Sequence, residues 1–271
     1  MNNLSHGKGF VMAKHKILWQ AATAVSGLPD YVAAIKRHAE KILGPEVTLD
    51  IRGVDFGTMD LHFAYFQFLN DHNLVESILR ASKEGYDGVA VGCICDSGVH
   101  LAREVTDIPV AGLAEAGMLF ACMYGKRFSV VTYTKELVHK RLDELIRSYG
   151  LKERASGMEY FDVPLEAIAK AFSDPAPVLD AFKSAVQRAV DKGAEVILPG
   201  CGILNLLSVE NGLTSVGNAT VLDVSGVLMK ILETMINLKE NSGIDVSRNG
   251  LYASPAKEQM EAAKKIYGVK W

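Results

Sequence analysis

The sequence predicts an α/β protein made of two similar halves. Two short, wholly apolar runs each lead into a Gly-Cys pair, one ending at Cys93 and the other at Cys201. An apolar run of this length bounded by glycine is typical of a buried parallel strand. Ile17 precedes Cys93 by 76 residues (93 − 17), and Phe128 precedes Cys201 by 73 residues (201 − 128). This equal spacing indicates an internal duplication.

The first half is expected to alternate strands and helices. Pro29 suits the first turn of a helix and Gly44 ends it, while Gly85 is the expected C-cap of the next helix. In chain order we expect strands at 15–20, 46–54, 89–91 and 109–113, and helices at 29–43, 73–83 and 97–105.

The pattern then restarts with a β-branched run at 127–132, which resembles the first strand. An amphipathic stretch that ends at Gly150 predicts a helix. The expected strands of this half are 127–132, 155–163, 195–198 and 220–224, and the expected helices are 135–149, 175–192, 226–238 and 255–267.

An aromatic stretch at 61–69 has two interpretations. The helical spacing of Tyr65, Phe66 and Leu69 favours a place in the core or an interface. The alternative is a lid that closes over a ring-shaped substrate. The C-terminal tail at 240–271 also carries apolar side chains, and we expect it to pack on the body or on a second subunit.

Composition limits the partners of the chain. Its 271 residues are 49% hydrophobic and carry a net charge of −3, which argues against nucleic acid or an anionic membrane as the main partner. No run of eighteen apolar residues is present. Residues 1–14 are polar and lack a signal-peptide core, so we expect a disordered arm. Four cysteines without a secretion signal indicate reduced thiols and a cytoplasmic protein.

Cys93 and Cys201 fall where an α/β sheet binds its ligand, beyond the carboxyl ends of the strands. If they face each other, one thiolate can remove a proton from carbon while the other thiol returns a proton to the opposite face. A cysteine pKa of about 8.5 makes both forms accessible, and a following helix N-terminus stabilises the thiolate. This scheme needs no metal and no cofactor. The backbone amides expected to face a developing enolate are those of Asp96, Ser97, Gly98, Gly202 and Ile203.

Other roles for the cysteines compete with this one. A cysteine at the end of an apolar strand is often only a small buried residue, and we assign that role to Cys122. Cys95 is expected to pack against, or support, Cys93. Cys93 and Cys95 could hold zinc with Cys201 and a histidine, but zinc knuckles usually have a longer spacer. Nucleophile-elbow, Walker, dinucleotide and His-Glu-x-x-His motifs are absent from the sequence.

These motifs resemble the aspartate/glutamate/hydantoin racemase superfamily, and within it the hydantoin and allantoin racemases. The likeness extends in order from about residue 85 to 238. It is carried by Gly92-Cys93 with Asp96 and Gly98, Arg103-Glu104, the segment 109–116, the segment 128–132, and the segment 193–195 that leads to Gly200-Cys201.

The resemblance implies two pseudo-symmetric α/β domains with mostly parallel four-stranded sheets flanked by helices and an active site in the cleft between them. We expect a first domain at 15–114 with 224–271 and a second at 115–223. It also implies a cofactor-independent, two-base mechanism with Cys93 and Cys201. The polar residues then expected to bind the substrate are Gln20, Thr23, Thr132, Tyr133 and Thr134.

Some positions depart from the family pattern. The first strand of the family usually leads into an Asn-Pro-Asn-type loop, whereas here the chain continues from Trp19 to Thr23 as Trp-Gln-Ala-Ala-Thr. Cys95 replaces an acidic or small residue, and Ser97 stands where proline is common. These differences concern the substrate more than the fold.

The predicted function is that of a racemase or isomerase acting at a carbon next to a carbonyl in a small hydantoin-like, amide or carboxylate substrate. We expect the enzyme to be a homo-oligomer. The alternatives on the same scaffold are an arylmalonate-type decarboxylase and a maleate-type cis–trans isomerase. The alternative of another class is a non-catalytic protein that binds a small ligand.

Overall fold

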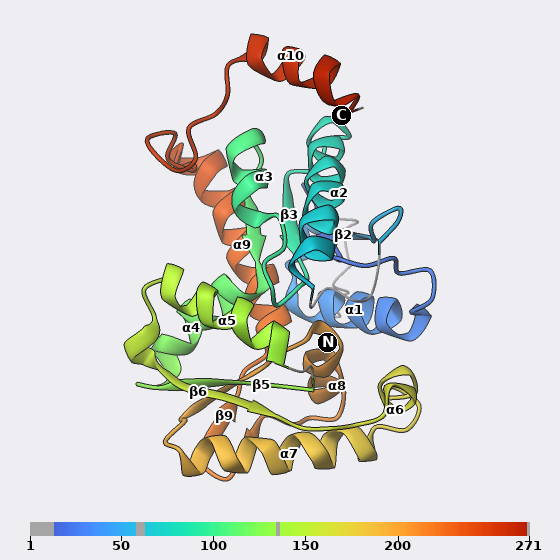
Figure 1. Cartoon of the computed structure of the whole chain (residues 1–271), viewed down its shortest axis with the longest axis vertical. Coiled ribbons are helices and arrows are strands. Elements are labelled where there is room, and N and C mark those ends of the chain that lie inside the picture. The colour runs from blue at the N-terminus through green and yellow to red at the C-terminus, as the bar shows by residue number, and fades with distance from the viewer. Residues whose placement is uncertain (1–13, 58–62, 134–135, 270–271) are drawn as a thin grey trace, which may run out of the picture.

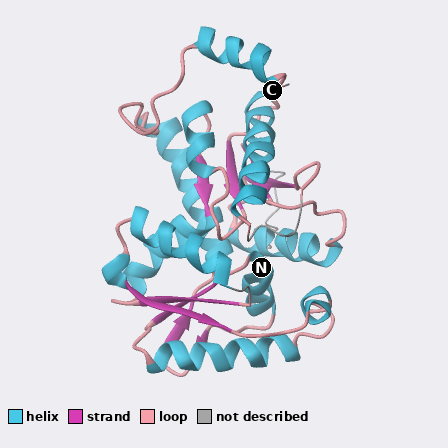
Figure 2. Ribbon diagram, viewed as in Figure 1, coloured by secondary structure: helices cyan, strands magenta, loops and turns pink. Residues whose placement is uncertain are grey.

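The computed structural model describes residues 14–57, 63–133 and 136–269, and it shows two parallel sheets flanked by helices (Figures 1 and 2). The first sheet has the order β2-β1-β3-β4 and every neighbouring pair is parallel. Its strands are β1 (His15–Gln20), β2 (Val47–Arg52), β3 (Gly88–Val91) and β4 (Val110–Gly112). The α/β fold class is confirmed.

The second sheet has five strands in the order β6-β5-β7-β9-β8, one more than expected. The extra strand pairs antiparallel with its neighbour through a two-residue turn in which Gly217 has a positive φ of 57°. Glycine adopts this conformation without strain, which suits a tight hairpin. The strands are β5 (Phe128–Thr132), β6 (Ala155–Tyr160), β7 (Val196–Pro199), β8 (Ser215–Val216) and β9 (Ala219–Val221).

Helices cover both sheets, and α7 lies below the second sheet in Figure 1. The helices are α1 (Pro29–Ile42), α2 (Ala64–Lys83), α3 (Val99–Val105), α4 (Leu113–Tyr124), α5 (Glu136–Ser148), α6 (Leu165–Ala169), α7 (Ala176–Asp191), α8 (Gly202–Glu210), α9 (Val224–Ser242) and α10 (Lys257–Tyr267), with a 3₁₀ turn at Lys152–Arg154. The proposed division into 15–114 with 224–271 and 115–223 leaves one sheet in each part.

The sequence analysis missed α4. Half of this helix is buried, including Leu113, Gly117 and Met118, so its sequence lacks the polar stripe that reveals a surface helix. The partly buried thiol of Cys122 donates to the carbonyl oxygen of Met118 at 3.3 Å. Cys122 packs at the edge of the core, as expected.

One hydrophobic core runs beneath both sheets. It includes Ile17 and Trp19 from β1 together with Phe128 and Leu198 from the second sheet. The indole of Trp19 is fully buried and occupies the space beside Gly92, where a Cβ would lie 2.3 Å from the ring. Only glycine fits before Cys93, because any side chain would collide with the rigid indole.

The aromatic stretch forms the first turns of α2, and its side chains do not enter the core. Tyr65 is 67% exposed and Phe68 is 66% exposed, so the prediction of a core position is wrong. Phe66 and Leu69 line a groove of about 660 Å³ along α2, together with Phe56. The remaining members of the predicted stretch, residues 61 and 62, lie outside the described residues.

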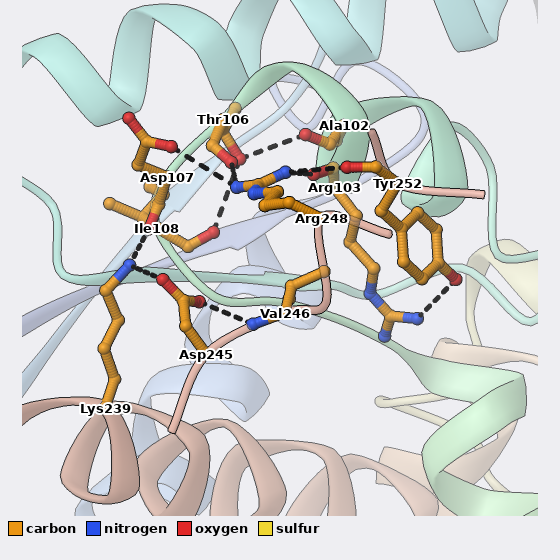
Figure 3. A network of polar contacts seen from close by, with 10 residues as sticks. All are labelled: Ala102, Arg103, Thr106, Asp107, Ile108, Lys239, Asp245, Val246, Arg248 and Tyr252. Carbon is orange, nitrogen blue, oxygen red and sulfur yellow. Dashed lines mark hydrogen bonds and ion pairs between the residues drawn. The ribbon is translucent and has the colours of Figure 1, made fainter. Parts of the chain in front are cut away.

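The C-terminal segment is held at the end of α3 and then leaves the body. The guanidinium of Arg248 donates to the carbonyl oxygens of Arg103 and Thr106, both at 2.6 Å (Figure 3). It also pairs with Asp107 at 3.3 Å. Beyond this anchor, α10 lies apart from both sheets in Figure 1, and none of its residues is buried.

Among the described residues, no helix combines the length and the apolar composition needed to cross a membrane.

Candidate active site

Two Gly-Cys loops, one from each sheet, meet between the two halves of the molecule. Cys93 follows β3, and Cys201 is the N-cap residue of α8. A Cβ added to Gly202 would lie 3.3 Å from the carbonyl oxygen of Gly92 and 2.7 Å from the hydroxyl of Tyr31. Glycine at position 202 therefore allows the two loops to approach each other closely.

Tyr31 lies where it feels both sulfur atoms. Its side chain comes from the buried face of α1, and negative charge on Cys201 or Cys93 adds to burial in raising the pKa of its phenol. The charge of Cys93 likewise raises the pKa of Cys201. The two thiols therefore share one electrostatic environment, with the phenol of Tyr31 beside them.

Hydrogen bonds favour the thiolate form of Cys93. The thiol of Cys95 donates to the Cys93 sulfur and lowers its pKa, and the Cys95 backbone N–H and the Ser97 hydroxyl act in the same direction. The Ser97 oxygen is 3.9 Å from that sulfur. The same contact raises the pKa of Cys95, which remains a thiol. Cys95 thus supports the charge on its neighbour, beyond packing against it.

Cys201 has the opposite tendency. Burial raises the pKa of its thiol, and this effect outweighs the hydroxyl of Tyr133 and the backbone N–H groups of Leu204 and Ile203, which lower it. The oxygen of Tyr133 is 3.2 Å from the sulfur. At neutral pH this arrangement favours a thiolate at Cys93 and a thiol at Cys201.

Asp96 is committed to holding the loop after Cys93. Its buried carboxylate accepts hydrogen bonds from the backbone N–H groups of Ala114 and Glu115, both at 2.8 Å, and from the hydroxyl of Tyr149 at 2.7 Å. Its own N–H donates to the carbonyl oxygen of Cys93 at 3.0 Å. Neither group is left to face a substrate, so Asp96 fixes the N-terminus of α4 to the Gly-Cys loop.

The remaining expected site residues differ in what their side chains contact. The fully buried side chain of Gln20 bonds to the carbonyl oxygen of Ala21 and accepts from Ser77. Thr132 donates to the carbonyl oxygen of Gly200 at 3.2 Å. These two side chains build the floor under the loops. Thr23 belongs to the loop after β1 and is partly exposed, and Thr134 lies outside the described residues.

Comparisons with known proteins agree with this geometry. A family model described as Asp/Glu/Hydantoin racemase matches residues 63–230. The chain belongs to this family. It is 31% identical over 215 residues to a hydantoin racemase of Pseudomonas sp. (strain NS671), which covers 78% of this chain and 82% of that protein. The resemblance predicted from the sequence is confirmed, and the protein is an isomerase of the racemase type.

Solved structures show the same fold. An allantoin racemase from Klebsiella pneumoniae superposes with a TM-score of 0.76 at 23% identity, over 90% of this chain and 94% of that chain. A variant of arylmalonate decarboxylase has a TM-score of 0.58 at 19% identity, over 88% of this chain and all (100%) of that chain.

Sequence reasoning missed two polar residues at the loops of this racemase-family protein. Tyr31 lies on the buried face of α1, which also carries Ala34 and Ile35, and only that helical spacing hinted at its direction. Asp71 lies within hydrogen-bonding reach of Ser97. Its position depends on how α2 packs, which no local motif encodes. Among the described residues, no group of three or more His, Cys, Asp or Glu side chains could hold a metal ion.

Proposed function

We propose that this protein racemises a small hydantoin-like substrate without a cofactor, with Cys93 and Cys201 as the two bases. The observation that carries the proposal is the meeting of the two Gly-Cys loops, in which each cysteine has its own set of hydrogen-bond donors. The division of labour follows from the opposite directions of their pKa shifts.

In the first half-reaction the Cys93 thiolate removes the proton from the carbon next to the carbonyl. The electron pair of that C–H bond moves onto the carbonyl oxygen and forms an enolate. The Cys201 thiol then donates its proton to the opposite face of the carbon. The products are the mirror-image substrate, a thiol at Cys93 and a thiolate at Cys201, which is the starting state of the reverse reaction.

The surroundings of each sulfur suit this exchange. When Cys201 carries the charge, the hydroxyl of Tyr133 and the amides of Ile203 and Leu204 stabilise it. When Cys93 carries it, Cys95 and Ser97 do so. The proposal keeps the amides of Gly98 and Gly202 and the side chain of Thr23 as the groups that face the substrate.

The choice of substrate rests on the relatives. The sequence is related to a hydantoin racemase and the fold is shared with an allantoin racemase, so cyclic ureides are the first compounds to test. Screening hydantoins, allantoin and dicarboxylates for an increase in melting temperature selects the ligand, because a molecule that binds only the folded chain stabilises it.

Deuterium exchange in heavy water tests the mechanism. Cys93→Ser and Cys201→Ser should each lower racemisation by roughly a hundredfold or more, since a serine hydroxyl is a far weaker acid and base than a thiol. Each variant can still exchange the proton of one enantiomer. Cys122→Ser is the matched control, because this thiol bonds to α4 and should leave the rate unchanged.

The same experiment separates the alternatives. The shared fold of arylmalonate decarboxylase makes loss of carbon dioxide the second candidate. A decarboxylase would lose activity with only one of the two substitutions and would release carbon dioxide from a malonate. A binding protein would exchange no deuterium, and that result would rule out the proposed chemistry.

A further inference from the structure

A buried chain of polar groups links Cys93 to helix α2. The hydroxyl of Ser97 is fully buried and lies 3.9 Å from the Cys93 sulfur. The carboxyl of Asp71 is within hydrogen-bonding reach of the same hydroxyl. This turn of α2 packs on the loop after Cys93, since a Cβ at Gly98 would lie 3.3 Å from the backbone oxygen of Asp71.

The Ser97 hydroxyl has one proton and two acceptors. It can donate to the sulfur of Cys93 or to the carboxylate of Asp71, but not fully to both. An ionised Asp71 competes for the proton, whereas a protonated Asp71 no longer needs it. The state of the carboxyl therefore decides whether the Cys93 thiolate keeps its donor.

Asp71 is placed to change state within the working range of an enzyme. Its Oδ1 atom is buried and lacks a hydrogen-bond partner among the described residues. Burial raises the pKa of Asp71 to about 6, against the lowering effects of Ser97 and of the Arg141 charge from α5.

Other charged groups near Cys93 do not fill this role. Asp96 faces Cys93 on its own loop, but its carboxylate is held by two backbone N–H groups and by Tyr149. Cys95 donates to the sulfur and stays protonated, and Cys201 and Tyr31 face Cys93 from the other loops. Among these groups, only Asp71 shares the Ser97 hydroxyl with Cys93.

We propose that Asp71 is a positioning residue that adjusts the basicity of Cys93 by competing for the hydroxyl of Ser97. With Asp71 ionised, Cys93 has one donor fewer and its pKa moves up towards that of Cys201. Two bases of similar strength suit a reaction that runs in both directions. The inference rests on the proposed function for the role of Cys93, but its test needs no substrate.

The test follows the rate of Cys93 alkylation by iodoacetamide against pH, with the modified cysteine located by peptide mass spectrometry. Asp71→Asn should lower the apparent pKa of Cys93 by about one unit, since the neutral amide leaves the Ser97 proton to the sulfur. Glu76→Gln, on the same helix, is the matched control and should change nothing.

A double-mutant cycle decides how Asp71 acts. In a Ser97→Ala background, Asp71→Asn should leave the Cys93 pKa unchanged, because the shared hydroxyl is gone. An equal shift in both backgrounds would mean that the Asp71 charge acts through space, and no shift in either would mean that Asp71 is uncoupled. Either result overturns the proposal.

The wild-type chain gives a second test that does not depend on the folding of Asp71→Asn. An isolated thiol below its pKa reacts roughly tenfold faster per pH unit, following its thiolate fraction. Between about pH 5 and 7, the window around the pKa of Asp71, the increase should be less steep, and Ser97→Ala should restore it. A full slope in the wild type contradicts the inference. A positive cycle in a protein that racemises nothing would instead reject only the proposed function.

Discussion

The hydroxyl of Tyr133 lies 3.2 Å from the sulfur of Cys201, at the end of β5 opposite the start of α8. This hydrogen bond is the side-chain contact that lowers the pKa of a thiol whose burial otherwise raises it. It gives the second sheet its own device for stabilising a thiolate, distinct from the Cys95 and Ser97 contacts of Cys93.

Tyr133→Phe should therefore slow the reaction without unfolding the protein. A hydrogen bond to a charged group contributes about 1.5–3 kcal/mol, so kcat/KM should fall roughly ten- to hundredfold. Two enantiomers interconvert with an equilibrium constant of one, so the fall must be the same from either enantiomer. Steady-state rates measured by polarimetry from both sides check this, and an unchanged kcat/KM would show that the phenol does not contribute.

Asp96→Asn should change how stability depends on pH. Burial raises the pKa of Asp96 to about 6, above the value of about 3.9 in an unfolded chain. The folded wild type then binds this proton more tightly, a stabilisation that is complete below about pH 4 and is lost as the pH rises through 6.

Asparagine does not titrate, so the free energy of unfolding of the variant, relative to the wild type, should increase by about 3 kcal/mol between pH 4 and pH 7. Urea unfolding at several pH values measures the difference. Asp71 titrates in the same range but is present in both proteins and cancels. A difference that stays constant with pH contradicts the assignment.

Gly202→Ala should inactivate the enzyme while the fold persists. The added methyl would lie 2.7 Å from the hydroxyl of Tyr31, which is buried and has little room to move. It would push apart the two loops that carry the cysteines, and kcat should drop by at least roughly tenfold because reacting groups need close alignment. Gly27→Ala, with open space around its Cβ, is the control. Wild-type kcat for Gly202→Ala, with an intact circular dichroism spectrum, would refute the close approach.

Arg248→Ala should release the C-terminal segment. The guanidinium caps the end of α3 through the carbonyl oxygens of Arg103 and Thr106 (Figure 3). Without it, proteolytic cleavage after α9 should accelerate by about tenfold, which corresponds to roughly 1.4 kcal/mol of lost anchoring. Arg147→Ala removes only an exposed i, i+4 pair and should leave the cleavage rate unchanged.

The strands and both cysteines could be predicted because each strand that carries a Gly-Cys pair is buried on both faces. Burial on both faces produces a continuous apolar run, which is visible in one dimension. The first half of α2 and the whole of α4 were missed for opposite reasons. The first turns of α2 expose large aromatic side chains, and α4 carries apolar residues on most of its surface. Neither has the usual amphipathic stripe.

The supporting residues of the site were harder to predict. Tyr133 was expected because it directly follows a strand that leads to the cleft, whereas Tyr31 and Asp71 reach the cysteines only through helix packing. Asp96 was expected to face the substrate, but its positive φ of 46° turns it towards α4. Long-range contacts of this kind carry no local sequence signal.

The core described above passes from β1 under one cysteine to β5 and β7 under the other, with Trp19 and Phe128 in the same cluster. Neither half of the molecule has an apolar interior of its own to fall back on. Heating or urea should consequently melt the chain in a single step, with enzymatic activity and helical signal disappearing at one midpoint. The alignment of the two thiols is thus guaranteed for as long as the protein is folded at all.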